Sequence, residues 1–123
     1  WLIYIYINIT ILVLMTNKNN KGETMQLLTK AQKDKMIKNN QEQDGTKEFK
    51  AVVKLFNPTG QGTWYLSELN PDTNVAFGLC KVTDEEYGYV DLNELTSFKG
   101  QMGLGIERDR WFMPTKFEDL KVA

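Results

Sequence analysis

The segment richest in side chains that can do chemistry lies between residues 103 and 114. It holds four successive charges of alternating sign: Glu107, Arg108, Asp109 and Arg110. An aromatic pair, Trp111 and Phe112, follows them. In an extended strand, successive side chains point to opposite faces. Arg108 and Arg110 would then share one face, and Glu107 and Asp109 the other. This pattern suits contact with a ligand or partner, and it suits structural ion pairing equally well.

Three further candidates belong to one predicted strand: Trp64, Tyr65 and Glu68. Regular alternation puts Trp64 and Glu68 on one face and Tyr65 on the other. We expect Trp64 to face the core, because large aromatic side chains are mostly buried. Glu68 would then be partly desolvated, and a desolvated carboxylate needs a cation nearby. Arg108 or Arg110 could supply it through a bidentate pair, so these seven residues form the predicted binding set.

The composition excludes several catalytic classes. The chain has no histidine, which removes histidine-dependent triads and histidine-containing zinc sites. Its one cysteine, Cys80, lies in an apolar run and is expected in the core of a protein kept in a reducing compartment. Carboxylate chemistry stays open, either as hard-metal binding or as acid/base catalysis by Glu68, Glu107 or Asp109. No set of residues predicts a cofactor or a metal site.

The net charge of -1 hides an uneven distribution. Residues 1–54 carry 9 lysines against 5 acidic residues, whereas residues 55–123 carry 6 basic against 11 acidic residues. A near-neutral total argues against a strongly basic nucleic-acid-binding domain. It leaves room for a local basic surface, for example on the lysine-rich helix predicted below.

The first 24 residues differ in composition from the remainder. Residues 1–15 are almost wholly apolar, yet shorter than the roughly 20 residues of a transmembrane helix. They also lack the basic start and the cleavage site of a signal peptide. With the polar stretch 16–24, we interpret them as an upstream extension and a disordered linker. Membrane association is therefore not expected unless residues 1–15 are a genuine anchor, and residues 25–123 are expected to form a single domain.

The remainder of the sequence predicts an α+β fold. A capping-box pair, Thr29 and Gln32, predicts a helix over residues 29–40. Short segments rich in β-branched and aromatic residues, separated by turn residues, predict an antiparallel sheet. Gly78 within the third of them indicates a bulge or a close backbone approach. The five expected strands cover residues 49–56, 63–69, 75–82, 87–90 and 106–112, and short helices are expected over residues 92–98 and 116–122.

Several motifs resemble a bacterial family known as domain of unknown function two-nine-five-eight. The resemblance covers residues 25–123 and is carried by five segments in order: residues 53–58, 62–65, 77–79, 86–95 and 103–112. It implies a small protein encoded on plasmids, phages or other mobile elements, sometimes joined to larger DNA-processing proteins. It implies no activity, so no catalytic role transfers to any residue of this chain.

Three functions are compatible with these observations. We expect a non-enzymatic binding or accessory module of a mobile element, located in the cytoplasm, which contacts a protein partner through the face of the fifth strand. The second is association with nucleic acid through the lysine-rich helix and the two arginines. The third is a carboxylate-dependent enzyme, with or without a divalent metal.

Overall fold

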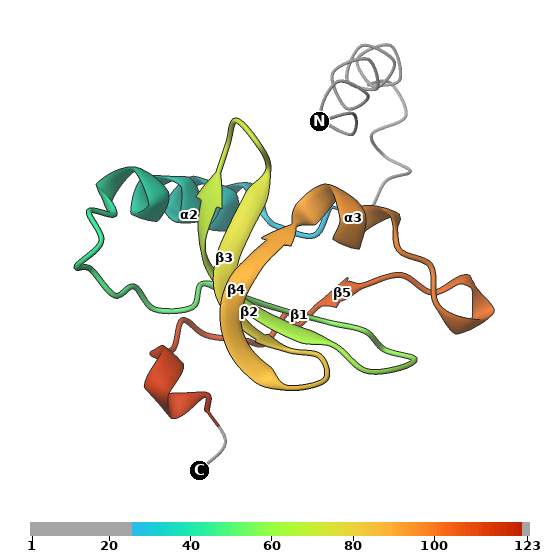
Figure 1. Ribbon diagram of the computed structural model, residues 1–123. Coiled ribbons are helices and arrows are strands. Elements are labelled where there is room, and N and C mark those ends of the chain that lie inside the picture. Colours follow the sequence, from blue (N-terminus) through green and yellow to red (C-terminus); the bar gives the residue numbers. More distant parts are fainter. Residues whose placement is uncertain (1–25, 122–123) are drawn as a thin grey trace, which may run out of the picture.

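The computed structural model describes residues 26–121, which form an α+β fold with a five-stranded antiparallel sheet. In Figure 1, α2 lies at the upper left beside the strands, and the red C-terminal segment lies at the lower left. The predicted fold class is confirmed. The predictions for residues 1–15 and 16–24 fall outside the described residues. Within residues 26–121, no helix combines the length and the apolar character that crossing a membrane requires.

The sheet is built mainly from strands that follow one another in sequence. Its spatial order is β4-β3-β2-β1-β5, so only β5 joins the sheet away from its neighbour in the chain. All four pairings are antiparallel. The strands are β1 (Val53–Phe56), β2 (Thr63–Asn70), β3 (Val75–Lys81), β4 (Glu85–Asp91) and β5 (Glu107–Arg108).

The two α-helices within residues 26–121 each begin after a capping residue. The α2 helix spans Lys30–Glu42, and the predicted capping box is present. The Thr29 hydroxyl accepts a hydrogen bond from the Gln32 backbone N–H at 3.1 Å, and the Gln32 side chain accepts one from the Thr29 N–H at 3.0 Å. Such a cap satisfies N–H groups that have no partner within the helix. The α3 helix spans Leu92–Ser97, and Asp91 caps it.

One face of the sheet is covered by α2, α3 and the segment before α2. We call it the covered face. The α2 helix packs on β2, and its Met36 is fully buried. Burying aliphatic side chains of this size stabilises a fold by about 1.5–3 kcal/mol each. The buried core of this face consists of Leu27, Leu28, Met36, Val52, Val53, Leu55, Leu66, Leu69, Ala76, Leu92, Leu95 and Ile106.

The opposite face has a smaller core, and we call it the aromatic face. Only three residues form its buried cluster: Ala51, Leu79 and Phe117. Phe117 comes from the C-terminal 3-10 helix η3 (Phe117–Asp119). Among residues 26–121 no α-helix lies over this face, and aromatic side chains of β3 and β4 reach its surface.

A β-bulge in β2 decides which residues face each side. The pairing with β3 advances from Leu66–Gly78 directly to Glu68–Phe77, so Ser67 is an extra residue in β2. Leu66 and Leu69 therefore lie in the same core although they are three positions apart. An extra residue reverses the alternation beyond it. Glu68 consequently lies on the aromatic face.

Gly78, opposite the bulge, makes the close approach that the sequence predicted. A Cβ atom at this position would lie 1.9 Å from the backbone oxygen of Tyr65 and 2.8 Å from the Cα atom of Leu66. Neither atom belongs to a flexible side chain. Only glycine fits here without a shift of β2.

Three predicted elements are shorter in the structure by more than one residue. The first strand begins at Val53, not residue 49, although Ala51 forms an isolated bridge with Thr115. The fifth strand ends at Arg108, because the Asp109 side chain accepts a hydrogen bond from the Trp111 N–H at 2.9 Å and turns the chain. At the C-terminal end, the predicted helix is the single 3-10 turn η3 within the described residues. A further 3-10 turn, η2 (Gln101–Gly103), interrupts the glycine-rich link.

Candidate functional site

A hollow on the aromatic face has a volume of about 480 Å³. Its floor comes from β2 and β3, one side from β4 and η3, and the other from the loop after α2. This volume is within the range of roughly 300–1,000 Å³ that holds small ligands or side chains. We call it the aromatic cavity. It is lined by Gln43, Gly45, Thr46, Lys47, Glu48, Phe49, Glu68, Phe77, Tyr87, Tyr89 and Phe117.

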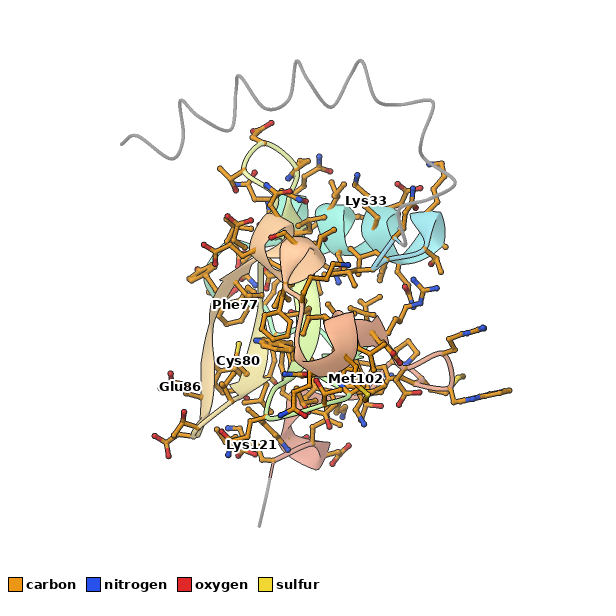
Figure 2. The ribbon with its side chains drawn as sticks, turned by 90° about the vertical axis from the view of Figure 1, so that its right-hand side faces the viewer. Lys33, Phe77, Cys80, Glu86, Met102 and Lys121 are labelled. Atoms are coloured by element: carbon orange, nitrogen blue, oxygen red, sulfur yellow. The ribbon has the colours of Figure 1, made fainter. Side chains whose placement is uncertain are left out.

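Aromatic rings from three elements form a continuous wall of the cavity. Phe77 on β3 lies 5.2 Å from the ring centre of Tyr89 and 6.2 Å from that of Tyr87, both on β4. Tyr87 in turn meets Phe117 edge to face at 5.4 Å. Rings at these separations attract one another and hold their orientations. In Figure 2, Phe77 and Cys80 lie along the sheet, with Lys33 of α2 above them and Lys121 below.

The loop after α2 is held in shape by the side chain of Gln43. The Gln43 Nε2 group donates to the Lys47 carbonyl and to Glu68 Oε2, both at 2.9 Å. Its Oε1 atom accepts from the backbone N–H groups of Gly45 and Lys47. Both hydrogens of the amide are used, so one neutral side chain links the loop to the sheet.

A second set of bonds orders the tip of the same loop. Asp44 Oδ1 accepts from the Thr46 backbone N–H at 2.9 Å and from the Thr46 hydroxyl at 2.6 Å. These hydrogen bonds favour the charged form and hold the pKa of Asp44 below its ordinary value. Gly45 has a φ of 93°, which is a conformation that favours glycine. The loop after α2 is therefore an ordered wall of the aromatic cavity, held by these hydrogen bonds.

Glu68 is the charged group at the floor of the cavity. Glu68 is only 8% exposed, and its carboxylate accepts a hydrogen bond from the neutral side chain of Gln43. Among residues 26–121, none of the ion pairs that the structure contains includes Glu68. Lys47 lines the same cavity but forms no ion pair with Glu68 among the described residues, so the carboxylate is buried without the direct ion pair that would compensate its lost hydration.

The predicted ion pair between Glu68 and Arg108 or Arg110 is wrong. Arg108 pairs in register with Leu55, a residue of the covered face, whereas the bulge turns Glu68 to the aromatic face. The Arg108 Nη1 group instead donates to the backbone carbonyls of Gln26 at 3.1 Å and Leu27 at 2.9 Å. The sheet thus lies between the two charges.

The charged stretch around β5 is largely engaged in local structure. Asp109 receives the Trp111 N–H and forms a 3.6 Å ion pair with Lys54. Arg110 and Trp111 are exposed, Trp111 to 90%. With neighbouring side chains they line a second, more open hollow of about 390 Å³, formed by Lys54, Phe56, Arg108, Asp109, Arg110 and Trp111.

The structure separates the predicted binding set into different places. Trp64 packs against the core of the covered face, as expected, and Tyr65 packs on the aromatic face beside Phe112. Among the described residues, neither Glu107 nor Asp109 lines the aromatic cavity with Glu68. The three carboxylates considered for catalysis therefore do not converge.

Cys80 is half-buried rather than fully buried, opposite Trp64 on the neighbouring strand. Burial raises the pKa of its thiol, and the charge of Glu86 raises it further. A thiol with a raised pKa is mostly protonated at neutral pH and therefore a poor nucleophile. This agrees with a structural role for the residue.

Comparison with protein families matches the chain to the family described as Protein of unknown function (DUF2958), over residues 27–118. This is well over half of the chain. The chain belongs to this family. Comparison with curated proteins gives no match, and neither does comparison with solved structures.

Sequence reasoning on this DUF2958 chain missed most of the cavity wall. Tyr87 and Tyr89 are two positions apart in a strand, a spacing that places both rings on one face and could have indicated an aromatic surface. The same holds for Phe77 and Leu79. For Gln43 no sequence signal existed, because its importance depends on a contact with Glu68, which is 25 residues away.

Proposed function

We propose that this DUF2958 protein is a non-enzymatic binding module that holds a segment of a partner protein in the aromatic cavity. The observation that carries the proposal is the exposure of Tyr87 and Tyr89, 42% and 77%, beside the hollow of the aromatic face. Aromatic side chains clustered around a concave surface are typical of interaction sites.

The cavity is a better supported site than the β5 face expected from the sequence. At β5, Arg108 donates hydrogen bonds to two backbone carbonyls. Just after β5, Asp109 accepts the Trp111 N–H and forms an ion pair with Lys54. Both charged groups therefore already have partners within the fold. In the cavity, by contrast, Glu68 forms no ion pair within residues 26–121, and the rings of Tyr87 and Tyr89 are accessible.

Selection of displayed peptides tests the proposal. The immobilised protein is used to select binders from a random peptide library, and each binder is measured against two variants. Tyr89→Ala should weaken binding by about tenfold or more, since aromatic anchors dominate such contacts. Trp111→Ala removes the most exposed aromatic ring of the β5 hollow and should change nothing. Failure to select any peptide contradicts the proposal, and the reverse pattern would move the site to β5.

The resemblance to proteins of mobile elements guides the search for the natural partner. We place the protein in the cytoplasm and its partner among proteins encoded beside it on a plasmid or phage. Co-expression with each neighbouring gene product, followed by purification on one tag, tests this. A neighbour that co-purifies with the parent but not with Tyr89→Ala would identify the partner.

The β5 hollow supports nucleic acid as the alternative partner. Arg110 and Trp111 are exposed there, next to Lys54, and a basic group beside an accessible ring can hold a stacked base. Within α2, however, Lys30 and Lys38 pair with acidic neighbours four residues on. Binding of labelled single-stranded DNA or RNA at low salt, lost in Trp111→Ala and weakened steeply by added salt, would favour this alternative.

A further inference from the structure

We propose that the aromatic cavity recognises a cationic side chain, an ammonium or a guanidinium group, with Glu68 as its counter-ion. This inference rests on the proposed function and adds the chemistry of the group that enters the cavity. The partner segment would present a lysine or an arginine, its charged end at Glu68 and its aliphatic stem along the rings.

The first argument is the state of Glu68. Its carboxylate lies at the floor of the cavity, receives one bond from a neutral amide and has no ion pair with any residue of the range 26–121. Water reaches so enclosed a group poorly, and an incoming cation restores the interaction that burial removed. The cavity therefore offers a carboxyl group that no ion pair within residues 26–121 occupies.

The second argument is the wall around that charge. A cation over an aromatic ring is attracted by the negative face of the ring, more strongly when water is displaced. The ring centre of Phe77 lies 6.2 Å from that of Tyr87 and 5.2 Å from that of Tyr89. All three rings line the same cavity as Glu68. Carboxylate and rings together favour an organic cation over a neutral or an acidic group.

The aromatic face already attracts cations of its own chain. The ammonium group of Lys121 lies 4.6 Å from the ring centre of Tyr87, and that of Lys81 lies 5.3 Å from the ring centre of Tyr65. Lys81 is also held by Glu85 and by the Leu120 carbonyl. Tyr87, which lines the cavity, and Tyr65, which lies outside it, are therefore both within cation–π distance of an ammonium group of the same chain.

The composition of the lining also distinguishes an organic cation from a hard metal ion. Calcium takes about six to eight oxygen ligands. The cavity offers two carboxylates, Glu48 and Glu68, among five aromatic side chains. An alkyl-ammonium or guanidinium group needs one carboxylate and apolar walls for its carbons, because long basic side chains bury their stems against apolar surface.

The test uses blocked tripeptides that differ only in their central residue. Acetyl-Gly-X-Gly-amide, with arginine, lysine, glutamine or glutamate as X, is titrated into the ¹⁵N-labelled full chain, and the amide signals of Gly45, Glu68 and Tyr89 are followed by NMR. We expect saturable shifts with the arginine peptide, the lysine peptide or both, and an affinity weaker by about tenfold or more for glutamine. Binding by one cationic peptide alone identifies the charged group. Equal binding of the glutamine peptide, or no binding of any peptide, overturns the inference.

Matched variants locate the effect at Glu68. Glu68→Gln keeps an oxygen that can accept the Gln43 bond and should weaken the cationic peptide by about tenfold. Glu94→Gln makes the same change at an exposed position of α3 and should have no effect. Tyr89→Ala, at a position that is 77% exposed, should fold normally and weaken binding by about two- to fivefold. Unchanged affinity in both cavity variants overturns the inference.

Failure of this inference differs from failure of the proposed function. If displayed peptides bind the cavity but contain no lysine or arginine, and Glu68→Gln binds them as the parent does, the cavity holds a partner of other chemistry and the cation inference is overturned. If the cationic tripeptides bind while the display selects nothing, cation recognition is supported and the protein-partner proposal is overturned.

Discussion

The two faces of the sheet use the same strands for different purposes. On the covered face, α2 and α3 lie over a continuous core in which Leu55, Leu66 and Leu69 have no exposed surface. On the aromatic face, the cover is a short C-terminal segment, and the ring of Tyr89 is largely exposed. The comparison shows that the aliphatic core is concentrated on one side of this small sheet, whereas aromatic side chains are exposed on the other.

The largest expected difference between the faces is in stability. Leu66→Ala on the covered face should lower the free energy of unfolding by about 2–5 kcal/mol, because it leaves a cavity in a closed core. Tyr89→Ala on the aromatic face should cost about 1 kcal/mol or less, since the ring loses mainly its contact with Phe77. Urea unfolding of both variants measures the difference. Similar losses would show that the aromatic face is a second structural core.

The glycine opposite the bulge gives a sharper test of how the faces are kept apart. Gly78→Ala should cost about 3 kcal/mol, because its methyl group would meet the backbone of Tyr65. Gly88, its direct partner on β4, has no atom within 4 Å of an added Cβ, so Gly88→Ala should lie within about 1 kcal/mol of the parent. Thermal unfolding compares the two. A tolerated Gly78→Ala would mean that β2 can move at the bulge.

The two arginines of the charged stretch should differ in a similar way. Arg108→Ala should lower the free energy of unfolding by about 1.5–3 kcal/mol, since its guanidinium holds the carbonyls of Gln26 and Leu27. Arg110 is exposed, and Arg110→Ala should change stability by no more than about 0.5 kcal/mol. Denaturant unfolding distinguishes them. Equal effects would contradict the assignment of Arg108 as the link between β5 and the segment before α2.

The smallest effect concerns the loop at the edge of the aromatic face. Hydrogen bonds from Thr46 lower the pKa of Asp44 in the folded protein. The stabilisation that these bonds give the loop should therefore be fully present above pH 3.8, the ordinary pKa, and should be lost as the pH falls through the lowered pKa. An NMR titration of the Asp44 carboxyl group should give a midpoint below 3.8. Thr46→Val removes the hydroxyl and should move the midpoint upward; no movement would contradict the cause assigned here.

The parts of the fold predicted from sequence are those fixed by neighbouring residues. Thr29 and Gln32 lie three positions apart, and their reciprocal bonds start α2 where expected. Turn residues likewise separated β1, β2, β3 and β4. Errors arose where a side chain overrides the local pattern. Asp109 turns the chain that otherwise reads as a longer fifth strand.

The candidate site was harder to predict, because it depends on the bulge at Ser67. Trp64, Tyr65 and Glu68 were recognised as candidates, but simple alternation gave Glu68 the wrong face and therefore the wrong partner. The signal for the irregularity lay on the adjacent strand, in Gly78. Sequence alone does not show which strand carries the extra residue, since the register is set by packing on both sides.

The antiparallel bridge between β1 and β5 also has a consequence for the order of folding. The strands from β1 to β4 are joined by short turns, so their loops close at low entropic cost. The pairing of β5 with β1, in contrast, joins Arg108 to Leu55, two residues that are separated by most of the domain's sequence. Contacts of that separation tend to form after the rate-limiting step. Loss of the Arg108 bonds should therefore accelerate unfolding in stopped-flow experiments while leaving the refolding rate nearly unchanged.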